Sequence, residues 1–129
     1  MSTLTLRVDP ARNDMRTVVV GGRLDTHTYL ELDQTLSPLL EDLSLHALVL
    51  DLRELQYISS AGVRSLFRAR KALSARGGRV LVVNPQPQIQ KVFDLVKAVP
   101  MHEIFASTAE ADAYLDAMQR KVLQGDDGD

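Results

Sequence analysis

A short apolar run that leads into an amphipathic helix constrains the fold of this chain more than any other feature. Residues 47–52 are almost entirely aliphatic and predict a buried strand. After a short connection, a helix is predicted from about Ser60 to Arg76, with apolar positions at helical spacing. These positions are Val63, Leu66, Phe67 and Leu73. A strand followed by a helix that packs back onto it is the unit from which parallel sheets are built.

The same alternation of strands and helices continues along the 129-residue chain. Strands are predicted at residues 3–8, 16–20, 47–52, 79–83 and 104–105. Helices are predicted at residues 29–43, 60–76, 87–99 and 108–122. The first two strands flank a turn cluster at residues 10–14 and should form an antiparallel hairpin. We therefore predict an α/β fold: a mixed four- to five-stranded sheet with helices mainly on one face.

Several boundaries follow from single residues. Gly21-Gly22 should end the second strand. Gly77-Gly78 should end the helix predicted at residues 60–76. Pro38 should either kink the first helix or restart it with Ser37 as cap. The predicted core is Val49, Leu50, Val63, Leu66, Leu81, Val82, Val92 and Phe93. The predicted inner face of the last helix is Ala109, Ala113, Leu115 and Met118.

Composition limits the kind of protein this is. The chain has no cysteine, which excludes disulfides and thiolate sites, and its net charge of −2 speaks against nucleic acid as a partner. It contains no apolar run long enough to span a membrane and no visible signal peptide, so we expect a cytoplasmic protein that does not bind membranes. Residues 1–122 should form a single domain, and residues 123–129 should be a disordered acidic tail.

The sequence offers little support for catalysis. The three histidines lack the close spacing of helical metal motifs; they are His27, His46 and His102. Neither Gly21-Gly22 nor Gly77-Gly78 has the spacing of a phosphate-binding loop. No Gly-x-Ser-x-Gly elbow is present. We therefore expect no catalytic site, no metal and no cofactor.

Two hydroxyls at the start of the helix after the buried strand are the main candidate site. Ser59 or Ser60 could cap free backbone N–H groups. The same position also suits a phosphate, because the N–H groups and the helix dipole favour an anion there. Gly62, in the first helical turn, would either let another backbone approach or relieve crowding against a neighbouring strand. We expect Ser60 to face solvent.

The other strand-to-helix junction carries a second group of polar residues. In a parallel sheet such junctions meet at one edge, so Asp25 and Thr26 are expected near Ser60. Either residue, or Thr28, could instead simply cap the helix that follows. Arg64, with Arg68 and Lys71 on the same helix face, could dock an acidic partner or form an ordinary solvated face.

Taken in order, these segments resemble the STAS domain family, and specifically the bacterial anti-sigma factor antagonists. The resemblance rests on Gly22–Asp25, Leu50–Leu52, Ile58–Val63 and Gly77–Asn84, and extends over roughly residues 4 to 120. It implies a STAS-like fold and a phosphoacceptor serine at position 60, with Ser59 as the alternative. It also matches Asp25 to an acidic residue near the family's partner surface. Together with the residue patterns above, this gives an expected partner surface of Asp25, Thr26, Ser59, Ser60, Gly62 and Arg64.

The resemblance implies partner switching. The unphosphorylated antagonist binds a GHKL-type serine kinase that is also the anti-sigma factor, phosphorylation releases it, and a PP2C-type phosphatase resets it. The sequence departs from the family pattern at Ser59 and Ala61, where Asp and Ser are common, and in the connection 97–102. Two alternatives remain: a non-switching scaffold subunit of a bacterial sensory complex, and a small-ligand binder or enzyme that uses the same sheet edge.

Overall fold

The computed structural model describes residues 2–98 and 105–125. The strands are β1 (Leu4–Val8), β2 (Met15–Leu24), β3 (Ala47–Asp51), β4 (Leu55–Ile58) and β5 (Arg79–Val83). The helices are α1 (Tyr29–Glu41), α2 (Ser60–Ser74), α3 (Pro87–Ala98) and α5 (Thr108–Leu123). The predicted alternation of strands and helices is confirmed, and one strand, β4, was not predicted.

The strands form one mixed sheet in the order β1-β2-β3-β5, with β4 also paired to β2. β1 and β2 form the predicted antiparallel hairpin, and the other pairings are parallel. The long strand β2 pairs with β3 along its first half and with β4 along its last residues, where Leu24 lies opposite Ile58. The predicted mixed sheet is therefore confirmed, with β1 and β5 at its edges.

Strand β2 does not end at Gly21-Gly22, as the sequence pattern suggested, because the glycines are part of the pairing. Gly22 has a φ of +81°, and a side chain there would place its Cβ 2.0 Å from the Thr3 carbonyl oxygen. Its lack of a side chain lets β1 approach closely while β2 continues. The register shifts immediately afterwards, between Gly22 and Arg23. The two residues that follow, up to Leu24, pair with β4.

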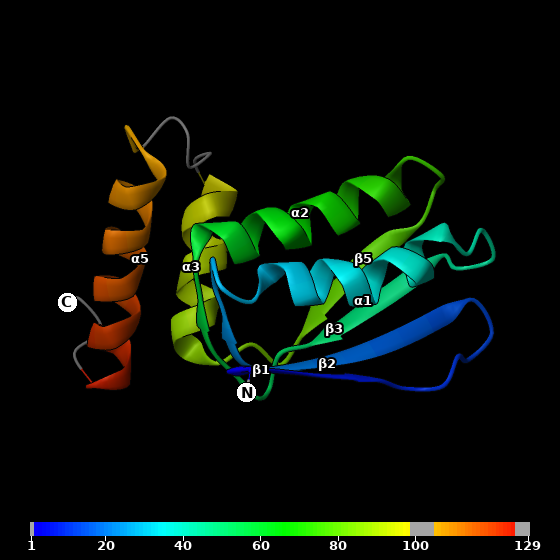
Figure 1. Cartoon of the computed structure of the whole chain (residues 1–129), viewed down its shortest axis with the longest axis horizontal. Coiled ribbons are helices and arrows are strands. Elements are labelled where there is room, and N and C mark those ends of the chain that lie inside the picture. Colours follow the sequence, from blue (N-terminus) through cyan, green and yellow to red (C-terminus); the bar gives the residue numbers. More distant parts are fainter. Residues whose placement is uncertain (1, 99–104, 126–129) are drawn as a thin grey trace.

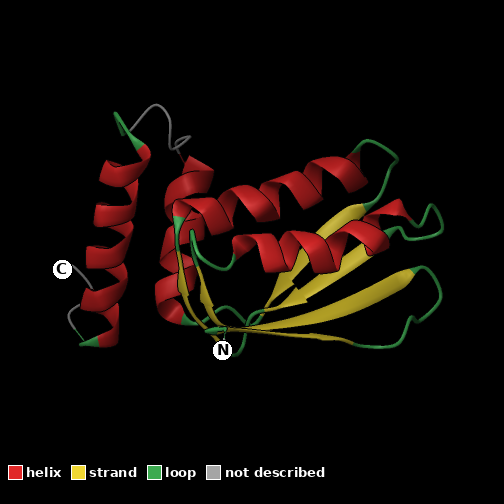
Figure 2. Cartoon of the chain, viewed as in Figure 1, coloured by secondary structure: helices red, strands yellow, loops and turns green. Residues whose placement is uncertain are grey.

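Helices α1 and α2 run side by side over one face of the sheet, and α3 and α5 stand at the end where β4 leads into α2 (Figures 1 and 2). Helix α1 continues through Pro38, so the predicted restart at Ser37 is wrong. The chain leaves α2 through Gly77, whose φ of +81° is the left-handed conformation expected after a helix. No helix in the described ranges is long and apolar enough to cross a membrane.

The core lies between the sheet and the helices. Leu50, Val63 and Val92 are fully buried and Leu66 nearly so, as predicted. Val49 and Phe93 are partly buried. Leu81 and Val82 were predicted in the core but are 36% and 38% exposed. β5 is an edge strand, so its side chains have neighbours on one side only.

The predicted inner face of helix α5 is right at two of its four positions. Leu115 is buried as predicted, whereas Ala109 and Ala113 are exposed and Ala111 and Gln119 are buried instead. Met118 packs against the core, as expected. The predicted strand at 104–105 and the predicted helix stop at Pro100 fall on or next to residues outside the described ranges. Phe105, which is described, packs against the Tyr114 ring with 5.4 Å between centroids.

Candidate functional site

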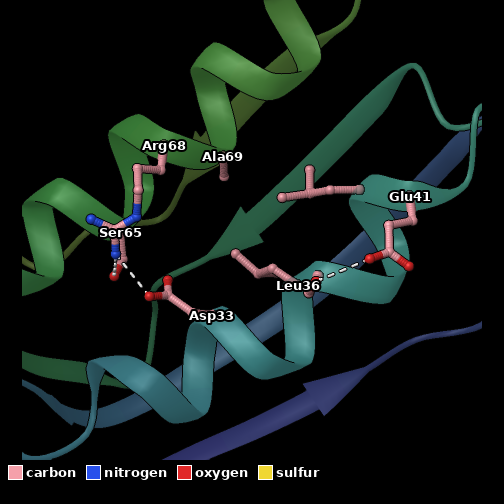
Figure 3. A pocket seen from close by; sticks show the side chains of 8 residues that line it. Asp33, Leu36, Glu41, Ser65, Arg68 and Ala69 are labelled. Atoms are coloured by element: carbon pink, nitrogen blue, oxygen red, sulfur yellow. Dashed lines mark hydrogen bonds and ion pairs between the residues drawn. The ribbon is translucent and has the colours of Figure 1, made fainter.

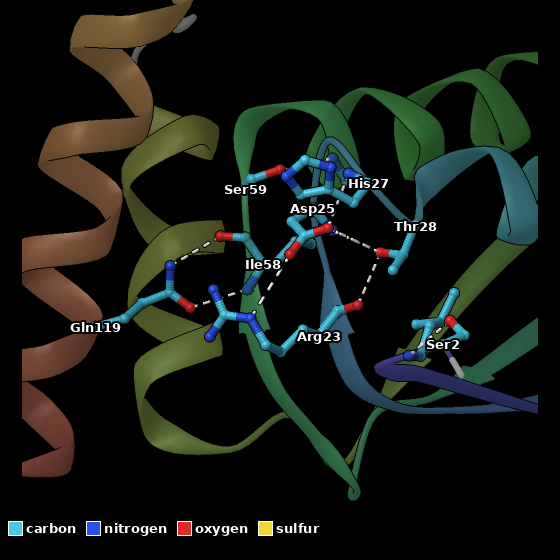
Figure 4. A network of polar contacts seen from close by, with 10 residues as sticks. Ser2, Arg23, Asp25, His27, Thr28, Ile58, Ser59 and Gln119 are labelled. Atoms are coloured by element: carbon cyan, nitrogen blue, oxygen red, sulfur yellow. Dashed lines mark hydrogen bonds and ion pairs between the residues drawn. The ribbon is translucent and has the colours of Figure 1, made fainter.

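The junctions β2–α1 and β4–α2 lie beside each other at one edge of the sheet. The Ser59 N–H donates to the Leu24 carbonyl oxygen at 2.9 Å, which continues the pairing of β2 and β4 by one residue. Asp25 and Ser59, each the first residue beyond its strand, therefore lie close together (Figure 4). The expectation that the two junctions meet at one edge is confirmed.

A compact set of hydrogen bonds holds Asp25 in place. Its carboxylate accepts from the His27 N–H at 2.9 Å and lies 3.6 Å from the Arg23 guanidinium. The Thr28 hydroxyl accepts from the Asp25 N–H at 2.9 Å and donates to the Arg23 carbonyl at 2.8 Å (Figure 4). Thr28 occupies the cap position of α1 but bonds back into the loop, and no side chain caps the helix there. Thr26 is exposed at the surface.

The two serines have different roles at the start of α2. Ser59 is the cap residue: its hydroxyl accepts from the Gly62 N–H at 3.5 Å. Ser60 is the first residue of the helix and is only 1% exposed, so the prediction that it faces solvent is wrong. The reason is that α5 covers it.

Asp112, on α5, binds Ser60 directly. One of its carboxylate oxygens, Oδ1, accepts from the Ser60 hydroxyl at 2.7 Å and from the Ser60 N–H at 2.9 Å. A carboxylate at a helix N-terminus is favoured by the dipole and by the free N–H groups. Asp112 therefore occupies the anion position that the sequence suggested for a phosphate, and sequence reasoning missed it.

Two turns further along α5, Gln119 pairs with the outer edge of β4. Its side-chain amide accepts from the Ile58 N–H at 3.0 Å and donates to the Ile58 carbonyl at 2.8 Å (Figure 4). A side chain thus replaces the neighbouring strand that β4 lacks. The signal that could have revealed both residues is their spacing, since Asp112 and Gln119 lie two helical turns apart on one face.

Gly62 and Arg64 lie on opposite sides of the first turn of α2. Gly62 is buried, and a Cβ there would lie 2.8 Å from both the Ile58 Cγ1 and the Leu24 Cγ. This crowding is the packing reason for glycine that the sequence left open, and a partner contact at Gly62 stays a prediction. Arg64 is exposed and makes no ion pair with the part of the chain that the structure describes.

Arg68, which the sequence grouped with Arg64, binds within the domain instead. Its guanidinium contacts the Asp33 carboxylate of α1 at 2.7 Å and the Ser65 hydroxyl at 3.0 Å. This ion pair crosses a cleft of about 310 Å³ between α1 and α2, and Leu36, Ser65 and Ala69 help to line it (Figure 3). Because Arg68 and Asp33 satisfy each other, the cleft offers no unpaired charge for a ligand at this point.

The pKa of Tyr57 is shifted by its surroundings at this site. Burial raises the pKa of its phenol above the usual value, and the nearby Asp116 and Asp112 carboxylates raise it further. Arg23 opposes them, with its guanidinium carbon 4.1 Å from the ring centroid. Among the described residues, no group of three or more His, Asp or Glu side chains could hold a metal ion.

Comparison with known proteins places this geometry in a wider setting. A family model of the STAS domain matches residues 8–111. The anti-sigma-B factor antagonist of Staphylococcus epidermidis is 28% identical over 83 residues, which are 64% of this chain and 76% of that protein. An anti-sigma factor antagonist from Mycobacterium paratuberculosis is 25% identical, with a TM-score of 0.59, over 75% of this chain and 83% of that one.

The fold also matches the Bacillus cell fate determinant SpoIIAA, solved in its phosphorylated form. The TM-score is 0.62 at 21% identity, over 74% of this chain and 86% of that one. At this identity the likeness concerns the fold.

Proposed function

The chain belongs to the STAS domain family, and from that premise we propose that it is an anti-sigma factor antagonist controlled by phosphorylation of Ser60. In its unphosphorylated form it binds a GHKL-type serine kinase that doubles as the anti-sigma factor, and this binding frees the sigma factor. A PP2C-type phosphatase returns the phosphorylated form to the binding state. These events take place in the cytoplasm, and the chain acts as a binding protein without catalysis of its own.

The observation that carries the proposal is the place of Ser60 in the fold. It is the first residue of α2, separated from the end of β4 by Ser59 alone, and the β2–α1 junction with Asp25 lies beside it. The backbone N–H of Ser60 is already bound by an anionic oxygen, that of Asp112. A phosphate on the same residue would find the same favourable helix end. The relatives named as anti-sigma factor antagonists support this reading, and one structural neighbour has been solved phosphorylated.

Charge explains how one phosphate could switch binding. It would bring about −1.5 to −2 charges to an edge that already carries Asp25 and Asp112. A partner that fits the unmodified edge would have to accommodate this added charge. A coupling of about 1–3 kcal/mol between phosphate and partner would weaken binding by roughly 5- to 150-fold. Thr26 and Arg64, both exposed, are the side chains we expect the partner to contact first.

The test is affinity capture from the native host with three baits: wild type, Ser60→Ala and Ser59→Ala. We expect the Ser60→Ala bait to retain a GHKL-type kinase and to carry no phosphate after incubation with ATP. Wild type should be phosphorylated at Ser60 and should then release the kinase. Ser74→Ala, an exposed hydroxyl at the other end of α2, is the matched control and should behave as wild type. Phosphate on neither Ser59 nor Ser60 would contradict the proposal.

One observation favours the alternative, a non-switching scaffold subunit. Ser60 is 1% exposed and bound by Asp112, an arrangement that suits a permanent structural role. In that case Ser60→Ala, Ser59→Ala and wild type would capture the same partners with equal affinity, and no phosphoserine would be found. The same capture experiment therefore separates the two functions.

A further inference from the structure

We propose that helix α5 is a gate over the phosphoacceptor: docking of α5 and phosphorylation of Ser60 exclude each other. The inference rests on the proposed function, because it concerns the regulation of the same serine. It names Asp112 as the positioning residue that holds the Ser60 hydroxyl when the gate is closed.

In the docked form, α5 denies a kinase access to the Ser60 hydroxyl. A kinase must bring its γ-phosphate in line with the Ser60 oxygen. In the docked form Ser60 is 1% exposed, and its hydroxyl donates a hydrogen bond to the Asp112 carboxylate at 2.7 Å. The neighbouring Ser59 is equally closed, at 3% exposure. The Ser60 hydroxyl cannot reach a kinase until α5 moves, so phosphorylation of Ser60 requires the undocked form.

The negative charge of Asp112 also opposes a phosphate on Ser60. The Asp112 oxygen already takes both the N–H and the hydroxyl of Ser60. A phosphate on Ser60 would need the same space and the same N–H donor, and it would place two anions against each other in a poorly hydrated site. Once phosphorylated, Ser60 therefore keeps α5 from docking again.

Helix α5 docks through a single stripe of residues. Asp112, Leu115 and Gln119 follow one another at helical spacing and contact Ser60, the core and Ile58, respectively. Loss of the first contact weakens the hold on the other two, because all three sit on one rigid helix. Opening the gate should thus also free the N–H of Ile58, which gives a readout independent of any kinase.

The direct test installs phosphoserine at position 60 during expression and measures hydrogen exchange at the amides of Ile58 and Ser60. We expect exchange at both amides to rise at least tenfold over the unmodified protein. Phosphoserine at the exposed position 74 is the matched control and should leave both amides protected. Unchanged protection of Ile58 with phosphate on Ser60 would overturn the gate.

A second arm measures how fast Ser60 is phosphorylated in extract of the native host. Asp112→Ala should raise the rate at least fivefold, and Asp116→Ala, on the same helix but paired with Arg120, should not. Equal rates for wild type and Asp112→Ala would refute the gate and leave the proposed function standing. Absence of phosphate from every variant would refute the proposed function, and the exchange experiment would still decide whether a phosphate and docked α5 are compatible.

Discussion

Gln119→Met is the sharpest test of how α5 is held on the domain. The side-chain amide of Gln119 is fully buried and satisfies both backbone groups of Ile58, at 3.0 and 2.8 Å. Methionine has a similar size and shape but can neither donate nor replace the amide oxygen. The substitution therefore keeps the volume and removes the hydrogen bonds, which leaves the N–H and C=O of Ile58 without partners.

The expected loss follows from counting these two groups. A buried backbone group left unsatisfied costs about 1–3 kcal/mol, so the two together give about 2–6 kcal/mol. The loss has a ceiling, because α5 can detach and let water reach Ile58 once the strain exceeds the free energy of docking. We expect a decrease of about 2–4 kcal/mol in the free energy of unfolding, which would lower the Tm by about 8–16 °C in a domain of this size.

Urea denaturation followed by circular dichroism measures this change, and exchange at the Ile58 amide shows whether α5 has detached. Gln90→Met is the matched control, since Gln90 is exposed on α3 and its side-chain amide donates to the exposed Asp94 carboxylate. It should change stability by no more than about 0.5 kcal/mol. A Gln119→Met protein as stable as this control, with the Ile58 amide still protected, would show that the amide does not hold α5.

Three further predictions concern other parts of the domain. Gly62→Ala should destabilise by up to about 2 kcal/mol in urea, because overpacking against Leu24 and Ile58 outweighs a helix-propensity gain of about 1 kcal/mol; a gain in stability would contradict this. The raised pKa of Tyr57 favours the protonated phenol in the folded state, so stability should fall as pH rises above about 10, and Tyr57→Phe should remove this part of the fall in melting experiments at pH 8 to 11.5. We also propose that residues 1–122 are the folded unit, so removal of the residues after Gln124 should leave the Tm and partner capture unchanged, whereas a loss of several degrees would refute it.

Sequence patterns predicted the sheet because its strands are strongly apolar and bounded by turn residues. They failed at β4, where Gln56 and Tyr57 break the apolar run and the strand is only four residues long. At β5 they predicted the strand but not its exposure, since Leu81 and Val82 are aliphatic yet exposed at the sheet edge. Aliphatic character predicts a strand, but the number of neighbours on either side depends on the order of strands in the sheet.

The candidate site was predicted only on the side contributed by local sequence. Ser59, Ser60 and Asp25 follow strands that pair, so their neighbourhood could be inferred from topology. The contribution of α5 could not, because Asp112 lies far along the chain and its helix has small apolar residues on several faces. Ala109 and Ala113 were wrongly assigned to the inner face, whereas Leu115 was assigned correctly and the buried Gln119 was missed.

Because Ser60 lies well before α5 in the sequence, the serine is synthesised before the helix that buries it. Ser60 precedes Asp112 by 52 residues. At about 5–20 residues per second, a ribosome needs roughly 3–10 s to add that stretch. Throughout this interval the nascent chain contains Ser60 but not yet α5. Every molecule is therefore first made in the open form and can close only after α5 has been synthesised.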